Sequence, residues 1–208
     1  MSLRSILELD ARLSDKMRVA EKPGALRSIA VFFAHSGDSW FWGVALILLW
    51  FFSSSFWKEW EVVEFVGISV LAVLVMGVKF LVRRKRPEGE WGGIYRNTDP
   101  HSFPSGHAAR AFLIAVIGAA LGPAWLGVLL WIWAPLVALA RVAMGVHYVS
   151  DVVAGAVGVE NLEGRGTHGE RAAVRQVVAG VVLEDARNRV RAVVGDDLER
   201  SGRVRREA

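Results

Sequence analysis

The sequence predicts an all-α fold: a polytopic membrane helical bundle with four full spans and a shortened fifth helix, flanked by amphipathic helices at both termini. Hydrophobic residues make up 53% of the chain and the mean hydropathy is +0.34, values that a soluble domain of 208 residues seldom reaches. The apolar residues form long runs, and most charged residues lie between them. Tryptophans stand at both ends of the first long run, as in the aromatic belts of membrane interfaces.

The composition also excludes several kinds of protein. The chain has no cysteine, which excludes disulfides and cysteine-ligated metals. A formal net charge of +4 is too small to indicate a nucleic-acid partner, so none is predicted. Acidic residues interrupt the N-terminus before any long apolar run, so we predict no signal peptide there.

Residues 1–38 are predicted to lie at the membrane interface. Apolar residues in the first half of this segment recur with a loose helical period and predict an amphipathic helix that ends near Pro23. Residues 26–33 predict a second short helix, and neither helix is long enough to span a bilayer. A turn follows, in which Asp38 or Ser39 is expected to cap the next helix.

Four apolar runs predict the four spans. Residues 39–57 carry no charge, and at ~1.5 Å per residue they reach roughly one hydrocarbon thickness; a buried helix of a soluble protein is the alternative. Residues 62–82 are interrupted by Glu64 near their start and by Lys79 near their end, from where a lysine can reach the interface. The third and fourth runs are residues 105–121 and 124–145.

Three further segments complete the chain. Residues 83–103 form a polar loop rich in glycine and proline, and loops this long inside compact domains are often functional. The fifth apolar run begins near His147 and meets Glu160 after about ten residues, or ~15 Å of helix, which is half a bilayer. Residues 160–208 predict a charged linker and an amphipathic tail, which is solvated or interfacial, or else serves oligomerisation or lipid sensing. Residues 39–159 are therefore the predicted membrane domain.

A histidine and a carboxylate lie one helical turn apart where the fourth and fifth runs meet. His147 and Asp151 can share one face of a helix, and Arg141 precedes them. A carboxylate beside an imidazole fixes its tautomer and stabilises its cation, which makes the other ring nitrogen a usable nucleophile or base. A buried polar pair that joins two helices is the alternative interpretation.

Ionisable residues recur at the ends of three predicted spans. If the spans alternate in direction, all of these residues reach the same membrane face. Membrane segments seldom carry such residues without a functional reason. The residues are Lys79 and Arg86 after the second run, Ser105, Gly106 and His107 at the start of the third, and Arg141, His147 and Asp151 at the last junction.

This set of residues fits phosphoryl chemistry. The lysine and the two arginines supply positive charge for a phosphoryl group and for the charge that develops on it. Ser105 and Gly106 at a helix start offer backbone N–H groups to an anion. His147, oriented by Asp151, can attack phosphorus, and His107 can protonate the departing oxygen. No cluster of carboxylates is left for magnesium, so we predict no metal and no other cofactor.

The motifs together resemble a known signature. Lys79-x6-Arg86-Pro87, Pro104-Ser105-Gly106-His107 and Arg141-x5-His147-x3-Asp151 resemble the three-part signature of the type 2 phosphatidic acid phosphatase superfamily. That superfamily includes lipid phosphate phosphatases, polyprenyl diphosphate phosphatases, glucose-6-phosphatase, bacterial class A acid phosphatases and vanadium haloperoxidases. Each motif alone is weak, but all three in order are highly specific. Residues 102–111 and the turn at residues 35–38 look most like the presqualene-diphosphate-phosphatase branch.

The resemblance implies a role for each residue. His147 would be the nucleophile that forms a phosphohistidine, Asp151 its orienting partner, and His107 the general acid. Residues 39–159 would be a membrane phosphatase domain that works without a metal and hydrolyses lipid phosphate monoesters or isoprenoid diphosphates. The residues implied in phosphate binding are Lys79, Arg86, Ser105, Gly106 and Arg141.

The sequence departs from the superfamily pattern at two positions. Ala140 stands where many members have a serine before the arginine, which removes one expected hydrogen bond to phosphate. Glu160 cuts short the last span, where relatives continue apolar, which leaves open how the helix that bears Asp151 packs.

Location and substrate follow from a site at the membrane surface. Such a site selects amphiphiles, and phosphatidic acid, lysophosphatidic acid and prenyl mono- or diphosphates remain open as substrates.

The basic N-terminus predicts a cytosolic start, and hence a site on the cytosolic face of an endomembrane or the plasma membrane. If residues 26–33 belong to a further span, the site lies on the opposite face. The alternatives are a vanadate-dependent haloperoxidase, although those relatives are typically soluble, and a catalytically idle membrane scaffold. The oligomeric state is not predicted.

Overall fold

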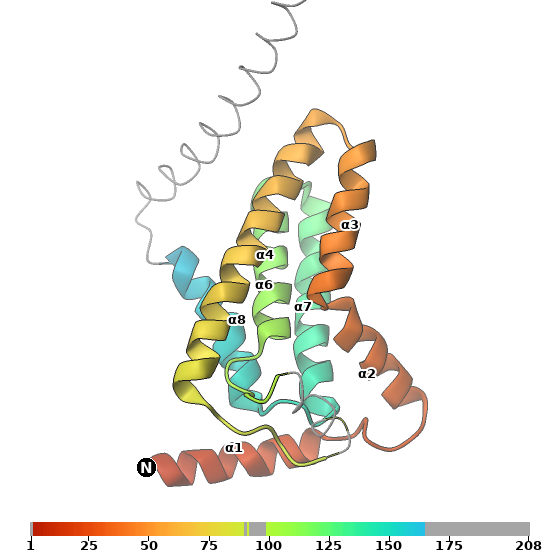
Figure 1. Cartoon of the computed structure of the whole chain (residues 1–208). Coiled ribbons are helices and arrows are strands. Elements are labelled where there is room, and N and C mark those ends of the chain that lie inside the picture. Colours follow the sequence, from red (N-terminus) through yellow and green to blue (C-terminus); the bar gives the residue numbers. More distant parts are fainter. Residues whose placement is uncertain (1, 90, 92–98, 165–208) are drawn as a thin grey trace, which may run out of the picture. The chain divides into compact units, whose positions relative to one another are not determined.

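The structure is a computed structural model that describes residues 2–89, 91 and 99–164. The chain divides into two compact units, residues 1–162 and 163–208, and every candidate site residue lies in the first. Apart from one isolated bridge between Lys85 and His101, the described residues form helices and connections only, which confirms the all-α class. The helices are α1 (Leu3–Met17), α2 (Ala25–Ser36), α3 (Ser39–Phe52), α4 (Ser55–Val82), α6 (Gly106–Leu121), α7 (Ala124–Ala143) and α8 (Val149–Gly164) (Figure 1).

Helices α6 and α7 form the centre of the bundle. Small residues let their backbones approach: a Cβ atom on Gly127 would lie 2.9 Å from the Cα atom of Ala119. Ile114 of α6 and Val137 of α7 are fully buried in the core between the helices. Helix α4 packs against α6, and α2 packs against α7. This packing fixes the start of α6 beside the end of α7, where the candidate site residues lie.

The first span differs from its prediction. Helix α3 ends at Phe52, and Trp57 belongs to α4. Ser53 and Ser54 separate the two helices, and the Ser53 hydroxyl donates to the Leu49 carbonyl at 2.7 Å. Serine competes for backbone hydrogen bonds in this way and favours helix ends. Because the stretch carries no charge, it was predicted as one continuous span, and the turn within it was missed.

The candidate spans are fewer than the four predicted. Among the described residues two helical stretches are long and apolar enough to cross a membrane, Trp60–Val82 and Ala124–Ala143. Helices α2 and α3 pass the same test only as a pair, bent by 58° at Gly37 and Asp38. The stretch at residues 26–33, expected to stay outside the spans, therefore belongs to a bent helical pair, while α6 and the apolar part of α8 are shorter.

Helix α1 has the amphipathic character that was predicted. Ile6 and Leu13 are about half exposed, whereas Asp10 and Ser14 are buried. The helix ends at Met17, before the predicted boundary, because the chain turns to let the Ala20 amide donate to the Ala143 carbonyl at the end of α7 (3.1 Å). Figure 1 shows α1 lying across the end of the bundle at which α7 ends and α8 begins.

The C-terminal region bears on two further expectations. Helix α8 continues past Glu160 to Gly164, so the charged residue does not end the helix. The predicted linker and amphipathic tail fall almost wholly on residues 165–208, which lie outside the described residues. The division into residues 1–38, 39–159 and 160–208 stays a prediction.

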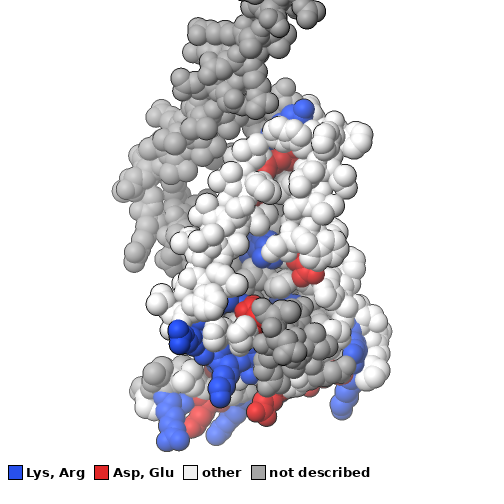
Figure 2. All heavy atoms as spheres, viewed as in Figure 1, with Lys and Arg blue, Asp and Glu red and all other residues white. Residues whose placement is uncertain are grey.

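The surface separates apolar from charged regions. Figure 2 shows lysines, arginines and acidic residues gathered at the end of the bundle where α1 lies, with few over the rest of this face. Large hydrophobic side chains are exposed along the bundle, among them Phe52, Val73 and Leu81. An extended exposed apolar surface of this kind suits contact with lipid.

Candidate active site

The residues of all three sequence motifs meet at one end of the bundle. Lys79 lies in the last turn of α4, His107 in the first turn of α6, Arg141 in the last turn of α7 and Asp151 in the first turn of α8. His147 lies in the turn between α7 and α8. Residues from four helices and two connections thus gather at one face, as the alternating directions of the spans predicted.

His147 is held between an arginine and a carboxylate. Its side chain is 1% exposed, and its Nε2 atom lies 3.1 Å from Nη1 of Arg86. Because a guanidinium only donates hydrogen bonds, Nε2 must be the unprotonated ring nitrogen. The proton then lies on Nδ1, 3.4 Å from Oδ2 of Asp151, a contact longer than an ordinary hydrogen bond. This tautomer leaves a lone pair on Nε2, as a nucleophile requires.

The turn that presents His147 depends on one glycine. Gly145 has φ +66°, in the left-handed region that favours glycine. Its N–H donates to the Val142 carbonyl at 2.8 Å, and the Val146 N–H donates to the Arg141 carbonyl at 3.2 Å. These bonds close the end of α7 and turn the chain back toward Arg86.

Asp151 is fixed by bonds to both of its carboxylate oxygens. Oδ2 accepts from the Tyr148 N–H at 2.9 Å, which caps the start of α8, and Oδ1 accepts from Arg84 at 2.8 Å. Arg84 also reaches Oδ2 of Asp10 in α1 at 2.6 Å. The sequence analysis did not include Arg84 or Asp10 in the site. Arg84 stands in a run of basic residues, and nothing local distinguishes the one that turns inward.

The burial of His147 leads to a prediction about the pH at which its ring titrates. Burial first, and then the positive charges of the surrounding arginines and lysine, lower the pKa of the His147 imidazole well below its ordinary value of 6.5. A lowered pKa keeps the ring neutral at and above that pH, and protonation follows only as the pH falls further. We therefore expect the His147 resonances of the free protein, observed by NMR with isotope-labelled histidine, to titrate below pH 6.5. Their absence in His147→Asn assigns them, and a midpoint at or above 6.5 would contradict the assigned environment.

An anionic side chain already lies among the cations. Asp99 Oδ2 accepts from Nη2 of Arg86 at 2.8 Å and also contacts Nζ of Lys79. Arg86 Nε donates to the Asp99 carbonyl at 2.7 Å, and Lys79 donates to the His101 carbonyl at 3.2 Å. Lys79 and Arg86 therefore converge on one carboxylate. The sequence analysis did not single out Asp99, because nothing in a polar loop marks the carboxylate that folds back.

Ser105 and Gly106 lie where α6 meets α8. The Ser105 hydroxyl caps α6 by accepting from the Ala108 N–H at 3.4 Å, and the Ser105 N–H donates to the Asp151 carbonyl at 2.9 Å. A Cβ atom on Gly106 would lie 3.4 Å from the Val75 side chain, so α6 starts close against α4. Ser105 is fully buried, and its hydroxyl serves the helix start.

His107 has its own carboxylate. Its Nε2 lies 2.7 Å from Oδ1 of Asp38, the residue before α3. The sequence analysis assigned Asp38 only as a possible helix cap. Each histidine of the predicted chemistry thus lies beside an aspartate, His107 beside Asp38 and His147 beside Asp151.

A cavity of about 260 Å³ opens beside the cations. Lys79, Asp99 and His107 line its polar end, and the α4 side chains from Ile68 to Met76 line its apolar wall. The other motif residues, Arg86, Arg141 and His147, are buried behind it and do not line it. Charge at one end and hydrocarbon along the wall match an amphiphile with an anionic head.

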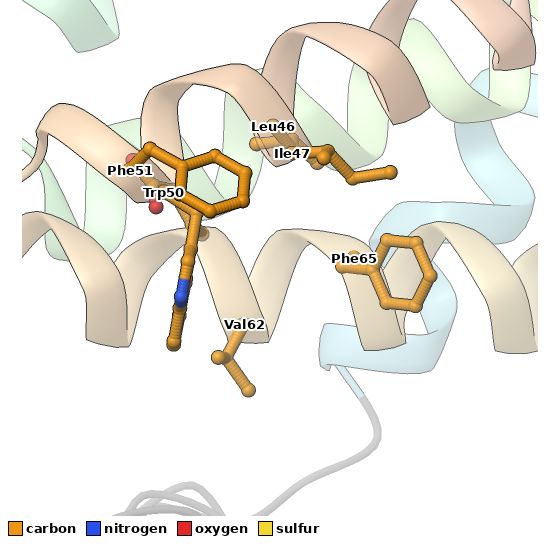
Figure 3. Close-up of a pocket in the computed structure, with 7 residues that line it drawn as sticks. Leu46, Ile47, Trp50, Phe51, Val62 and Phe65 are labelled. Carbon is orange, nitrogen blue, oxygen red and sulfur yellow. The ribbon is translucent and has the colours of Figure 1, made fainter.

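A second pocket, of about 300 Å³, lies between α3 and α4. Figure 3 shows Leu46, Trp50 and Phe51 of α3 facing Val62 and Phe65 of α4. Its lining is almost wholly apolar, and it begins some 14 residues along α4 from Lys79, or ~21 Å. It is separate from the cationic end of the bundle.

The described residues offer no evident metal site. No group of three or more histidine, cysteine or acidic side chains lies in ligand geometry anywhere in residues 2–89, 91 and 99–164. The expected absence of a cofactor stays a prediction.

Comparison with known proteins identifies the domain. Residues 60–158 match the model of the PAP2 superfamily. The chain carries a PAP2 superfamily domain. The match confirms the resemblance that the three motifs indicated, and it contains every predicted catalytic and phosphate-binding residue.

Several curated proteins are similar to the PAP2 domain. Decaprenylphosphoryl-5-phosphoribose phosphatase of Mycobacterium tuberculosis is 37% identical over 100 residues, which cover 47% of this chain and 54% of that protein. Undecaprenyl-diphosphatase of Sulfolobus acidocaldarius is 30% identical over 134 residues, 62% of this chain and 64% of that one. Probable lipid phosphate phosphatase beta of Arabidopsis thaliana is 29% identical over 180 residues, which cover 73% of this chain and 84% of that protein. The chain spans about half the length of the mycobacterial relative.

Two solved structures share the fold. A transmembrane PAP2-type phosphatidylglycerolphosphate phosphatase from Bacillus subtilis aligns with a TM-score of 0.58 at 20% identity, over 79% of this chain and 89% of that one. LpxE of Aquifex aeolicus aligns with a TM-score of 0.56 at 27% identity, over 70% of this chain and 89% of that one. The exposed apolar helices, two of which are long enough to cross a membrane among the described residues, indicate an integral membrane protein.

Proposed function

We propose that this protein is an integral membrane phosphatase that hydrolyses lipid phosphate monoesters or isoprenoid diphosphates through a phosphohistidine, without a metal ion. The observation that carries the proposal is the position of His147: its unprotonated Nε2 is bonded to a buried arginine within a cluster of cations that already holds a carboxylate. The relatives are named as phosphatases of polyprenyl and lipid phosphates, which supports the same reaction class.

The reaction would run in two displacements. In the first, Nε2 of His147 forms a bond to phosphorus while the bond to the leaving oxygen breaks, and His107 gives that oxygen its proton. Asp151 would stabilise the positive charge that the attacking ring acquires. In the second, His107 accepts a proton from water, the water oxygen attacks phosphorus, and inorganic phosphate leaves His147.

The cations would stabilise the phosphoryl oxygens in both steps. Lys79, Arg86 and Arg141 supply fixed positive charge in a buried setting, where such charge acts more strongly than in water. The Gly106 N–H at the start of α6 would add a backbone donor. The phosphate has to take over the contacts that Asp99 makes with Lys79 and Arg86, so Asp99 must yield part of its position on binding.

The membrane arrangement forms part of the proposal. We infer four spans and a shorter fifth helix, with the bent α2–α3 pair as the first span. Hydrogen bonds join α1 to the start of α8, so the N-terminal helix and the site share one face. The basic N-terminal segment then favours the cytosolic face for both.

Activity with a chelator present tests the proposal. We expect the purified protein in detergent to release phosphate from members of a panel of phosphatidic acid, lysophosphatidic acid, farnesyl diphosphate and a long-chain prenyl diphosphate. We expect EDTA to leave the rate unchanged, because the described cations supply the charge that a metal would otherwise provide. Sealed inside-out vesicles should act on externally added short-chain substrate without detergent.

Four outcomes would contradict this proposal. Release of phosphate from no member of the panel would reject the activity, and loss of activity with EDTA would reveal a metal. Activity only in right-side-out vesicles would place the site on the opposite face. Halide oxidation with vanadate and peroxide, in place of hydrolysis, would favour the haloperoxidase alternative.

A further inference from the structure

We propose that Asp38 is a positioning residue for catalysis, which orients His107 and stabilises its protonated form when it protonates the leaving oxygen. This inference rests on the proposed function. It concerns a residue outside the three motifs and outside the matched residues 60–158.

The carboxylate of Asp38 is directed to His107 and not to its own helix. Asp38 occupies the N-cap position of α3, yet its side chain makes no capping bond there. Oδ1 lies 2.7 Å from His107 Nε2, while Oδ2 contacts the His35 ring at 3.0 Å and accepts from the Trp40 indole at 3.2 Å. A residue that served only to start α3 would use its oxygens on the free N–H groups of that helix.

The bond to Asp38 determines which nitrogen of His107 is available. With Nε2 donating to the carboxylate, Nδ1 is the nitrogen left for the substrate, and within the described part of the chain no hydrogen bond engages it. His107 lines the cavity beside Lys79. The carboxylate therefore orients the ring as Asp151 orients His147, with the two ring nitrogens exchanged.

The turn that carries Asp38 is anchored on both sides. Arg110 of α6 donates to the Gly37 carbonyl at 2.5 Å. Trp42 donates to the Ser36 carbonyl at 2.9 Å, and Trp133 of α7 donates to the Ser36 hydroxyl at 2.8 Å. These bonds hold the bend between α2 and α3 against α6 and α7. The carboxylate is thus preorganised, which is what a group that must act at a fixed distance requires.

The negative charge of Asp38 favours the protonated form of His107 that the reaction requires. His107 must carry a proton when the leaving oxygen departs, but burial of the ring, and then the positive charges of Arg141 and Arg110, disfavour a positive ring. An adjacent carboxylate offsets that repulsion. The neutral amide of Asp38→Asn would keep the size of the side chain and lose the compensation.

The leaving group distinguishes this role from a structural one. A nitrophenolate departs without a proton, whereas an alkyl alcohol needs one. For Asp38→Asn we expect kcat/KM to fall about 100-fold with decyl phosphate, within the range for loss of general acid catalysis, and less than about threefold with nitrophenyl phosphate. Because kcat/KM reports the steps up to departure of the first leaving group, the later hydrolysis of the phosphohistidine does not enter.

Two variants serve as controls. In His107→Asn, kcat/KM should fall with the same selectivity for the leaving group. The double variant should lose no more kcat/KM than His107→Asn alone, since both residues act on one proton transfer. Glu8→Gln removes an exposed carboxylate from α1 and should leave both substrates unaffected. Activity of Asp38→Asn on nitrophenyl phosphate also demonstrates that the variant folds.

The outcomes separate this inference from the proposed function. An equal loss on both substrates, or no loss on either, would overturn the role of Asp38 and leave the phosphatase intact. A wild-type protein that hydrolyses neither substrate would overturn the proposed function and the role of Asp38 with it.

Discussion

Replacement of His147 by alanine is expected to lower phosphate release from lipid phosphates by roughly four orders of magnitude or more, as removal of a nucleophile does in other covalent mechanisms. The ring nitrogen that is bonded to Arg86 within the cation cluster disappears with the substitution. Steady-state assays in detergent measure the loss. Rapid quenching in alkali should trap a base-stable phosphoprotein with the wild type and none with His147→Ala.

A matched control removes a different histidine. His168 lies outside the described residues, in the predicted linker, and His168→Ala is expected to keep both turnover and the trapped phosphoprotein. Turnover by His147→Ala within tenfold of the wild type would remove His147 as the nucleophile, because one decade of rate corresponds to only about 1.4 kcal/mol.

Replacement of Asp10 by alanine is expected to lower the free energy of unfolding by about 3 kcal/mol, as when a buried ion pair loses one partner. Asp10 accepts from the Ser150 N–H at 2.9 Å and the Ser150 hydroxyl at 2.5 Å, and it pairs with Arg84 at 2.6 Å. The change leaves the first N–H groups of α8 with fewer acceptors. We expect activity to fall too, since Asp151 lies in that turn. Denaturant unfolding in micelles measures the stability.

Another aspartate on the same helix provides the comparison. Asp15 is 65% exposed and pairs with Arg18 at the surface, so Asp15→Ala should change stability by less than about 1 kcal/mol. Equal effects of Asp10→Ala and Asp15→Ala would mean that α1 does not contribute through its contact with α8.

The sequence was most informative where residue type and spacing combine. The helical class and the meeting of the three motifs followed from apolar runs and from the residues at their ends, because alternating spans must return those ends to one face. The roles of His147, His107 and Asp151 stay predictions until the variants are measured.

The sequence alone could not predict which side chains pair across the folded structure. Arg84 and Asp10 lie 74 positions apart, and no local pattern links them. Asp38 has the sequence context of a helix cap, and only the bend between α2 and α3 brings it to His107. The turn at residues 53 and 54 was missed because serine is uncharged and interrupts no hydropathy run.

The docking of α1 has a practical consequence for anyone producing this protein. Asp10 of α1 is connected to Asp151 through the side chain of Arg84, so removal of α1 would take away one of the two carboxylates that Arg84 bridges. Turnover numbers from preparations shortened at the N-terminus would then understate those of the full chain. Retaining residues 1–17 in the expressed protein avoids the error.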